Sequence, residues 1–91
     1  MWQLVWTTTL ARRCCKLLPR NPELDEALSA ALALLAENPR HPRLKLHPLH
    51  GELAGLWAVR VTHSFRLVID LKESQQEVTL LALCSHDEVY W

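Results

Sequence analysis

The stretch from Leu56 to Leu71, LWAVRVTHSFRLVIDL, constrains the fold of this chain more than any other. Larger apolar residues, many of them β-branched or aromatic, occupy every second position along it. This pattern predicts two strands joined by a tight turn at residues 62–64. If Val61 pairs with Phe65 across that turn, all seven larger apolar side chains fall on one face of the hairpin. That face has to be covered by other parts of the chain.

The same register places Arg60 directly opposite Arg66 on the other face of the hairpin. Like charges that face each other destabilise a sheet, whereas guanidinium groups bind phosphate through planar, paired hydrogen bonds. Two interpretations are therefore open. Either an anion such as a phosphate binds between the two arginines, or both side chains are solvated and held by nearby carboxylates.

The remaining segments supply the other elements of an α+β fold. Residues 2–6 predict a short first strand, and residues 10–18 predict a helix. The Asn21-Pro22 pair predicts the start of a second helix, with Asn21 as its cap, and Asn38-Pro39 predicts its end. Residues 77–84, EVTLLALC, are typical of a strand covered on both faces. We therefore expect the order β-α-α-β-β-β, in which a helical hairpin packs on the sheet.

Length and charge limit what this chain can be. Its 91 residues are enough for one domain, spanning 1–91. The ten cationic and ten acidic side chains give no net charge, which by itself indicates neither nucleic-acid nor membrane binding. However, seven of the ten cations precede residue 46, and no carboxylate lies before Glu23 or between residues 38 and 51. This distribution favours a basic first helix and a basic loop, which are able to share one face.

The three cysteines match neither a disulfide framework nor a zinc-binding spacing. Reduced thiols favour a cytoplasmic protein. The sequence shows no signal-peptide pattern and no uncharged apolar stretch of 18 residues, so we expect no membrane segment.

Histidines mark the irregular segment of residues 39–55, PRHPRLKLHPLHGELAG. Loops of this length in a small domain are usually functional. His47 and His50 in this loop and His86 near the C-terminus do not match a metal-ligand spacing, so we expect neither a metal nor a cofactor. Imidazole titrates near neutral pH, so that His47, His86 and the neighbouring Tyr90 favour proton transfer. The alternative is that each is an ordinary surface or packing residue.

Together with the arginines, these groups suit a ribonuclease that needs no metal. A base takes the proton of a ribose 2′-hydroxyl, and that oxygen attacks the adjacent phosphorus in line. An acid protonates the leaving 5′-oxygen, while an arginine stabilises the charge that builds on the phosphoryl oxygens.

A series of motifs in the second half makes this interpretation more specific. A basic, proline-containing loop ends in HPLHG, a glycine and an aromatic residue begin the next strand, an FRLV strand follows, and SHDEVY lies at the end. In this order and spacing they resemble the RelE/ParE superfamily of bacterial toxins, and its RelE/StbE, YoeB and YafQ-like branches in particular. The resemblance covers residues 39–91, whereas residues 1–38 match only in their strand-helix-helix order.

The resemblance implies a RelE-like α+β fold with a mainly antiparallel, twisted sheet. It also implies the toxin of a type II toxin–antitoxin system, which acts as a ribosome-dependent endoribonuclease. The implied partners are a cognate antitoxin protein and mRNA on the ribosome, with no membrane.

Carried over by position, the resemblance assigns a role to individual residues. His47 stands where relatives place a loop histidine or glutamate, and Arg66 where YoeB-like toxins place a phosphate-stabilising arginine. His86 stands where relatives place a general acid or base, and Tyr90 where RelE has a functional tyrosine. The candidates for RNA binding are Arg43, Lys45, His50 and Arg60.

Departures from the family pattern keep alternatives open. These toxins are usually basic, whereas this chain is neutral. RelE also uses lysines where this chain has histidines, so the sequence does not decide whether His47 or His86 is the base. The alternatives are a ParE-like inhibitor of DNA gyrase with the same fold, and an inactive relic that binds only the antitoxin.

Overall fold

The computed structural model describes residues 1–85 of the chain. Its two helices are α1 (Thr8–Leu17) and α2 (Pro22–Glu37). Its strands are β1 (Gln3–Trp6), β2 (His47–Pro48), β3 (Trp57–Arg60), β4 (Phe65–Lys72) and β5 (Glu77–Ser85). Short 3-10 turns connect several of them. The predicted α+β order is confirmed, and β2 is an additional strand that the sequence did not indicate.

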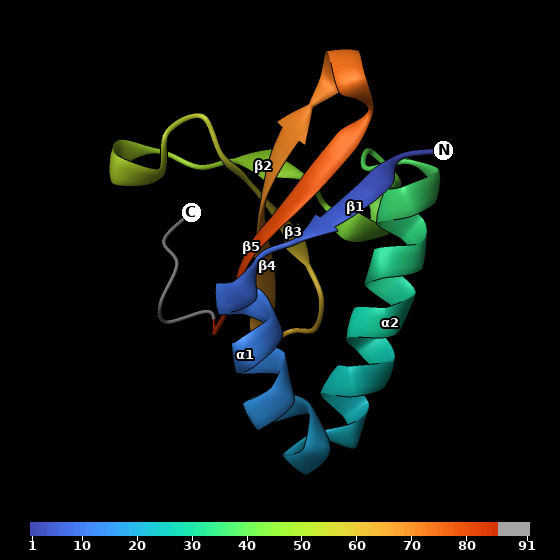
Figure 1. Ribbon diagram of the computed structural model, residues 1–91, viewed down its shortest axis with the longest axis vertical. Coiled ribbons are helices and arrows are strands. Elements are labelled where there is room, and N and C mark those ends of the chain that lie inside the picture. Colours follow the sequence, from blue (N-terminus) through green and yellow to red (C-terminus); the bar gives the residue numbers. More distant parts are fainter. Residues whose placement is uncertain (86–91) are drawn as a thin grey trace.

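All five strands belong to one sheet, in the order β1-β5-β4-β3-β2. The contacts between β2, β3, β4 and β5 are antiparallel, while β1 runs parallel to β5 at one edge. The sheet is therefore mixed and mainly antiparallel, as expected. A parallel neighbour requires a long crossover connection, and in the described structure α1 and α2 lie on the path from β1 to the rest of the sheet (Figure 1).

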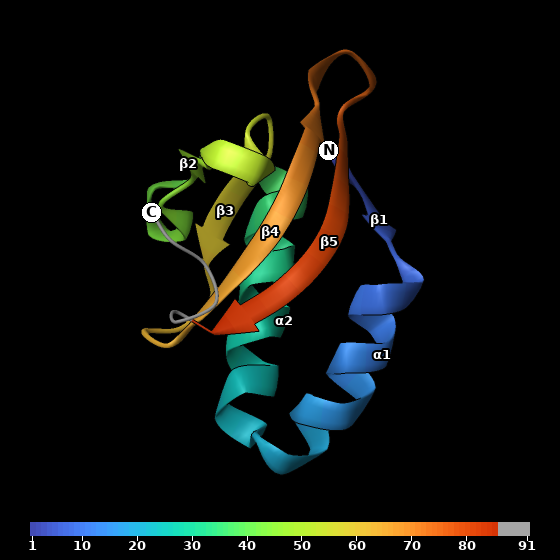
Figure 2. The ribbon, with the colours of Figure 1, turned by 90° about the vertical axis from the view of Figure 1, so that its left-hand side faces the viewer.

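The central hairpin has the register that the alternation predicts. Arg60 pairs with Arg66, and the backbone N–H of Val61 donates to the carbonyl of Phe65 at 3.1 Å. The seven larger apolar side chains of the hairpin all belong to the main core, either buried or packed against it. Figure 2 shows α2 behind β3, β4 and β5, on the side that this core occupies.

Both helices bury one stripe of side chains in that core. Thr7 caps α1, because its hydroxyl oxygen accepts a hydrogen bond from the backbone N–H of Leu10. The buried positions fall at helical spacing on each helix and are Leu10, Cys14, Leu24, Leu28, Ala31 and Leu35. Asn21 occupies the N-cap position of α2, as expected, but its side chain makes no capping hydrogen bond there. Its side-chain nitrogen instead donates to the carbonyl of Leu17 at 2.9 Å, which satisfies the end of α1.

The β5 strand is fully buried only on the side of the helices. A β-bulge interrupts its pairing with β4, because Ile69 pairs with Leu80 whereas Val68 pairs with Ala82, which leaves Leu81 as an extra residue. On the opposite face a smaller apolar cluster forms around Leu49 and covers this side of the sheet in part. The prediction of a strand covered on both faces is therefore only partly met.

No helix in the described part of the chain is both long and apolar enough to cross a bilayer.

Candidate functional site

A shallow hollow of about 350 Å³ is lined by Lys45, His47, Arg60 and Arg66. These four residues come from the loop before β2, from β2 itself, and from β3 and β4. All four were singled out from the sequence, two as catalytic candidates and two as RNA-binding candidates. The structure therefore brings together cations and an imidazole from segments about 20 residues apart along the chain.

Strand pairing explains this convergence. His47 lies opposite Ala58 in the sheet, and Arg60 follows Ala58 by two positions and lies opposite Arg66. Cross-strand partners share a face of a sheet, and residues two apart on a strand share it too. His47, Arg60 and Arg66 therefore share the face that α1 and α2 do not cover.

Lys45 helps to fix the orientation of His47. Its backbone adopts the left-handed conformation, with φ of 50°, and its carbonyl oxygen lies 2.8 Å from Nδ1 of His47. A carbonyl oxygen can only accept, so Nδ1 carries a proton in this contact. In the neutral imidazole the lone pair is then on Nε2, which is buried. This contact orients the imidazole ring beside the hollow that His47 lines.

The guanidinium of Arg66 is held by the β3–β4 turn. Its Nη1 donates to the carbonyl oxygens of Thr62, His63 and Phe65, at 2.6, 3.2 and 3.2 Å. Partial burial, and secondarily the positive charge of Arg60, lower the pKa of Arg66 below its ordinary value. An anion between the two arginines would offset both effects.

The other predicted site residues lie elsewhere or outside the described residues. Arg43 lines a neighbouring hollow of about 150 Å³ together with Arg60 and the small side chains of α2. His50 is exposed and lines neither of these two hollows. His86 and Tyr90 fall in the segment after residue 85, which the structure does not describe.

The cations of α1 occupy a separate place. Arg12, Arg13 and Lys16 line their own hollow with Thr9, and none of them lines the hollow of His47 and Arg66. The basic first helix and the basic loop therefore do not form one continuous site. Among residues 1–85, no group of three His, Cys, Asp or Glu side chains is arranged to hold a metal ion.

The hydroxyl oxygen of Thr62 accepts hydrogen bonds from the backbone N–H groups of Ser64 and Phe65, whereas the sequence analysis assigned Thr62 only to the turn. Thr and Ser in a tight turn commonly form hydrogen bonds to the backbone two or three residues further on, and this tendency is the signal that could have found it.

Comparison with known proteins supports the fold. No family model and no curated protein matches the chain, but solved structures do. A YoeB/ParE toxin from Agrobacterium tumefaciens is similar with a TM-score of 0.78 and 24% identity, over 92% of this chain and 98% of the other. YafQ from E. coli has a TM-score of 0.76 and 17% identity, over 97% of both chains.

A third similar structure has the highest identity of these three. It is a chain of the toxin–antitoxin complex RelBE2 from Mycobacterium tuberculosis, with a TM-score of 0.64 and 28% identity, over 93% of this chain and 98% of the other. The names of these three structures, YoeB/ParE, YafQ and RelBE2, match the branches that the sequence motifs resemble. The chain therefore has the fold of the RelE/YoeB-like toxin superfamily, as the sequence resemblance implied.

Proposed function

We propose that this chain is the toxin of a type II toxin–antitoxin system and cleaves mRNA on the ribosome. The observation that carries this proposal is the hollow in which His47 and Arg66 meet, with Lys45 and Arg60 beside them. A binding protein does not need a base next to a pair of phosphate-binding cations, whereas a ribonuclease does. The similar structures add that the fold is one that toxins use.

The proposed chemistry follows from the orientation of each group. His47 accepts the proton of a ribose 2′-hydroxyl. The 2′-oxygen attacks the adjacent phosphorus, and the bond to the 5′-oxygen breaks. Arg66 and Arg60 stabilise the negative charge on the phosphoryl oxygens. His86 is the proposed acid that protonates the leaving 5′-oxygen, and Tyr90 is a further candidate for this step.

The neutral net charge limits how strongly the whole surface attracts RNA. Lys45, Arg60 and Arg66 line one hollow, and Arg43 lines the adjoining one with Arg60. We propose that these cations bind the mRNA backbone locally, with His50 at the exposed edge of the loop. The proposed protein partner is a cognate antitoxin, because one of the similar chains comes from a toxin–antitoxin complex. The proposed place of action is the cytoplasm.

The products of the reaction test this proposal. Attack by the 2′-oxygen leaves a 2′,3′-cyclic phosphate and a free 5′-hydroxyl, whereas attack by water leaves different ends. We expect the purified chain to cleave mRNA on translating ribosomes with these ends, and we expect RNA with 2′-deoxyribose at the cleaved nucleotide to resist. Replacement of His47 by Ala should lower the cleavage rate by about 100-fold. Intact mRNA together with inhibited gyrase would favour the ParE-like alternative, for which the name of one similar structure gives some support.

A matched control separates local chemistry from general charge. Arg66→Ala removes a cation from the hollow, and Arg20→Ala removes an exposed cation from the connection between α1 and α2. We expect the first variant to lose cleavage and the second to retain it. Equal losses in both variants would mean that the hollow is not the site of the reaction.

A further inference from the structure

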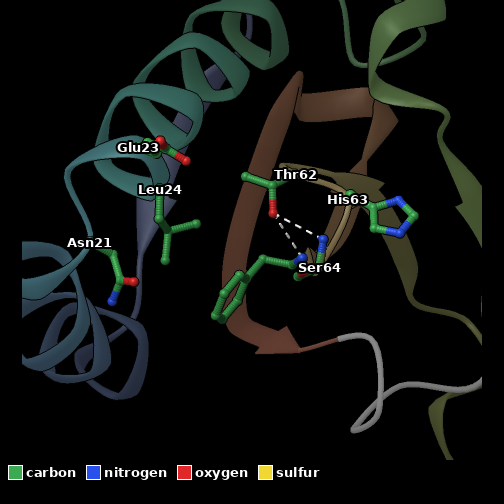
Figure 3. A pocket seen from close by; sticks show the side chains of 7 residues that line it. Asn21, Glu23, Leu24, Thr62, His63 and Ser64 are labelled. Carbon is green, nitrogen blue, oxygen red and sulfur yellow. Dashed lines mark hydrogen bonds between the residues drawn. The ribbon is translucent and has the colours of Figure 1, made fainter.

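The β3–β4 turn contains a side chain that organises its backbone. The hydroxyl oxygen of Thr62 accepts hydrogen bonds from the backbone N–H groups of Ser64 at 3.1 Å and Phe65 at 3.0 Å (Figure 3). Without this oxygen, both N–H groups would lose their partner within the turn. The hydroxyl of Thr62 therefore fixes how the chain reverses between the two strands.

The same turn holds the guanidinium of Arg66 through its backbone carbonyl groups. The three carbonyl oxygens that accept from Nη1 belong to Thr62, His63 and Phe65. Phe65 is thus tied at both ends, because its N–H donates to Thr62 and its carbonyl accepts from Arg66. Any change in the path of the turn moves the acceptors of Arg66.

The turn is not closely packed on the side of α2. A hollow of about 310 Å³ separates it from the start of α2, and its lining includes Asn21, Glu23 and Leu24 on one side and Thr62 and Phe65 on the other. Figure 3 shows the side chains of Thr62 and Leu24 facing each other across this space. The turn therefore has room to move toward α2 if its internal hydrogen bonds are lost.

We propose that Thr62 is a positioning residue for the phosphate contact of Arg66. Its hydroxyl fixes the path of the turn, the turn fixes the positions of three carbonyl oxygens, and these oxygens fix the position of Nη1 of Arg66. The place of Nη1 in turn fixes where the rest of the guanidinium lies in the hollow that Arg66 lines. This inference depends on the proposed phosphate contact, but not on cleavage of RNA.

The test compares two replacements of Thr62. Thr62→Val keeps the shape of the side chain and removes the hydroxyl, whereas Thr62→Ser keeps the hydroxyl. The probe is inorganic phosphate, titrated into the full chain and followed by nuclear magnetic resonance of the Arg66 side chain. We expect the valine variant to bind phosphate roughly fivefold to tenfold more weakly, and the serine variant to bind nearly as the wild type. Rotation of the Arg66 guanidinium should also become faster in the valine variant only.

Thr79→Val provides the matched control, because Thr79 is a half-buried threonine on β5 that pairs with Asp70 and does not line the hollow of Arg66. Weaker phosphate binding in Thr62→Val but not in Thr79→Val supports the inference, even if the wild type does not cleave RNA. Unchanged binding in Thr62→Val overturns it, and so does a wild type that binds no phosphate. If Thr62→Val fails to fold, the test uses Thr62→Ser alone. Phosphate binding by Thr62→Ser that is as weak as that of Arg66→Ala would then overturn the inference.

Discussion

Arg60 and Arg66 lie directly opposite each other across β3 and β4, on the face of the sheet that the helices leave open. Both arginines are half-buried residues, and burial together with the charge of Arg60 lowers the pKa of Arg66. This arrangement is unfavourable in the free protein, because like charges repel across a pair of strands. An anion bound between the two arginines would offset this repulsion.

A double-mutant cycle tests this explanation. In the absence of phosphate, Arg60→Ala should raise the free energy of unfolding by about 0.5 kcal/mol, since it relieves the repulsion. In the Arg66→Ala background the same replacement should have little effect. At saturating phosphate the sign should reverse, because Arg60 then contributes to binding. Urea unfolding with and without phosphate measures all four variants, and a coupling that keeps one sign in both conditions contradicts the prediction.

In the described part of the chain, two non-glycine residues adopt the left-handed backbone conformation. They are Lys45, with φ of 50°, and Gln76, with φ of 51°. Glycine adopts this conformation without the steric cost that other residues pay there. We expect Lys45→Gly and Gln76→Gly each to raise the free energy of unfolding by up to about 1 kcal/mol. Thermal unfolding measures this effect.

Only one of these two glycine variants should affect the hollow. Lys45→Gly removes a cation that lines it, whereas Gln76 lies in the turn between β4 and β5. We expect weaker RNA binding for the first and unchanged binding for the second. Since the backbone effect is matched, a loss of binding in both variants would show that backbone strain, and not the charge of Lys45, matters.

Burial of Cys14 makes the fold less stable at alkaline pH. Burial, followed by the neighbouring charge of Cys15, raises the pKa of the Cys14 thiol above its ordinary value of 9.0, against the opposing charge of Arg13. The unfolded chain therefore loses this proton at a lower pH than the folded chain does. The contribution of the Cys14 thiol to the free energy of unfolding is fully present below about pH 9, and it is lost as the pH rises through the folded-state pKa.

Cys14→Ala should remove most of that alkaline decrease. The measurement is the urea midpoint at about pH 7 and about pH 10, for the wild type, Cys14→Ala and the exposed neighbour variant Cys15→Ala. Cys15→Ala should keep most of the decrease, because burial is the larger cause. A decrease of the same size in Cys14→Ala would assign the effect to other groups.

Local patterns in the sequence were enough to predict much of the fold. The hairpin register followed from the alternation between Trp57 and Leu71, since only one register buries the larger side chains together. The bounds of α2 followed from Asn21-Pro22 and Asn38-Pro39, although Asn21 forms its hydrogen bond to α1. A two-residue strand such as β2 is too short to produce a periodic pattern, and it was missed.

The candidate site depended on that missed strand. Residue types alone identified His47 and Arg66, but their meeting in one hollow results from the pairing of β2 with β3. Thr62 acts through its hydrogen bonds to the backbone, and such a role becomes visible only when the path of the turn is known. Sequence therefore predicts which groups are chemically capable, and tertiary pairing decides which of them meet.

The bulge in β5 gives a last test of the register, because the uniformly apolar run EVTLLALC does not indicate which residues face the helices. Regular alternation from Leu80 would place Ala82 and Cys84 in the main core, whereas the bulge at Leu81 places Leu83 there, fully buried. Leu83→Ala should therefore lower the free energy of unfolding by about 2–5 kcal/mol. Cys84→Ala, on the opposite face, should lower it by about 1 kcal/mol or less. Urea unfolding of the two variants compares them directly, and a larger loss for Cys84→Ala would mean that the strand runs without the bulge.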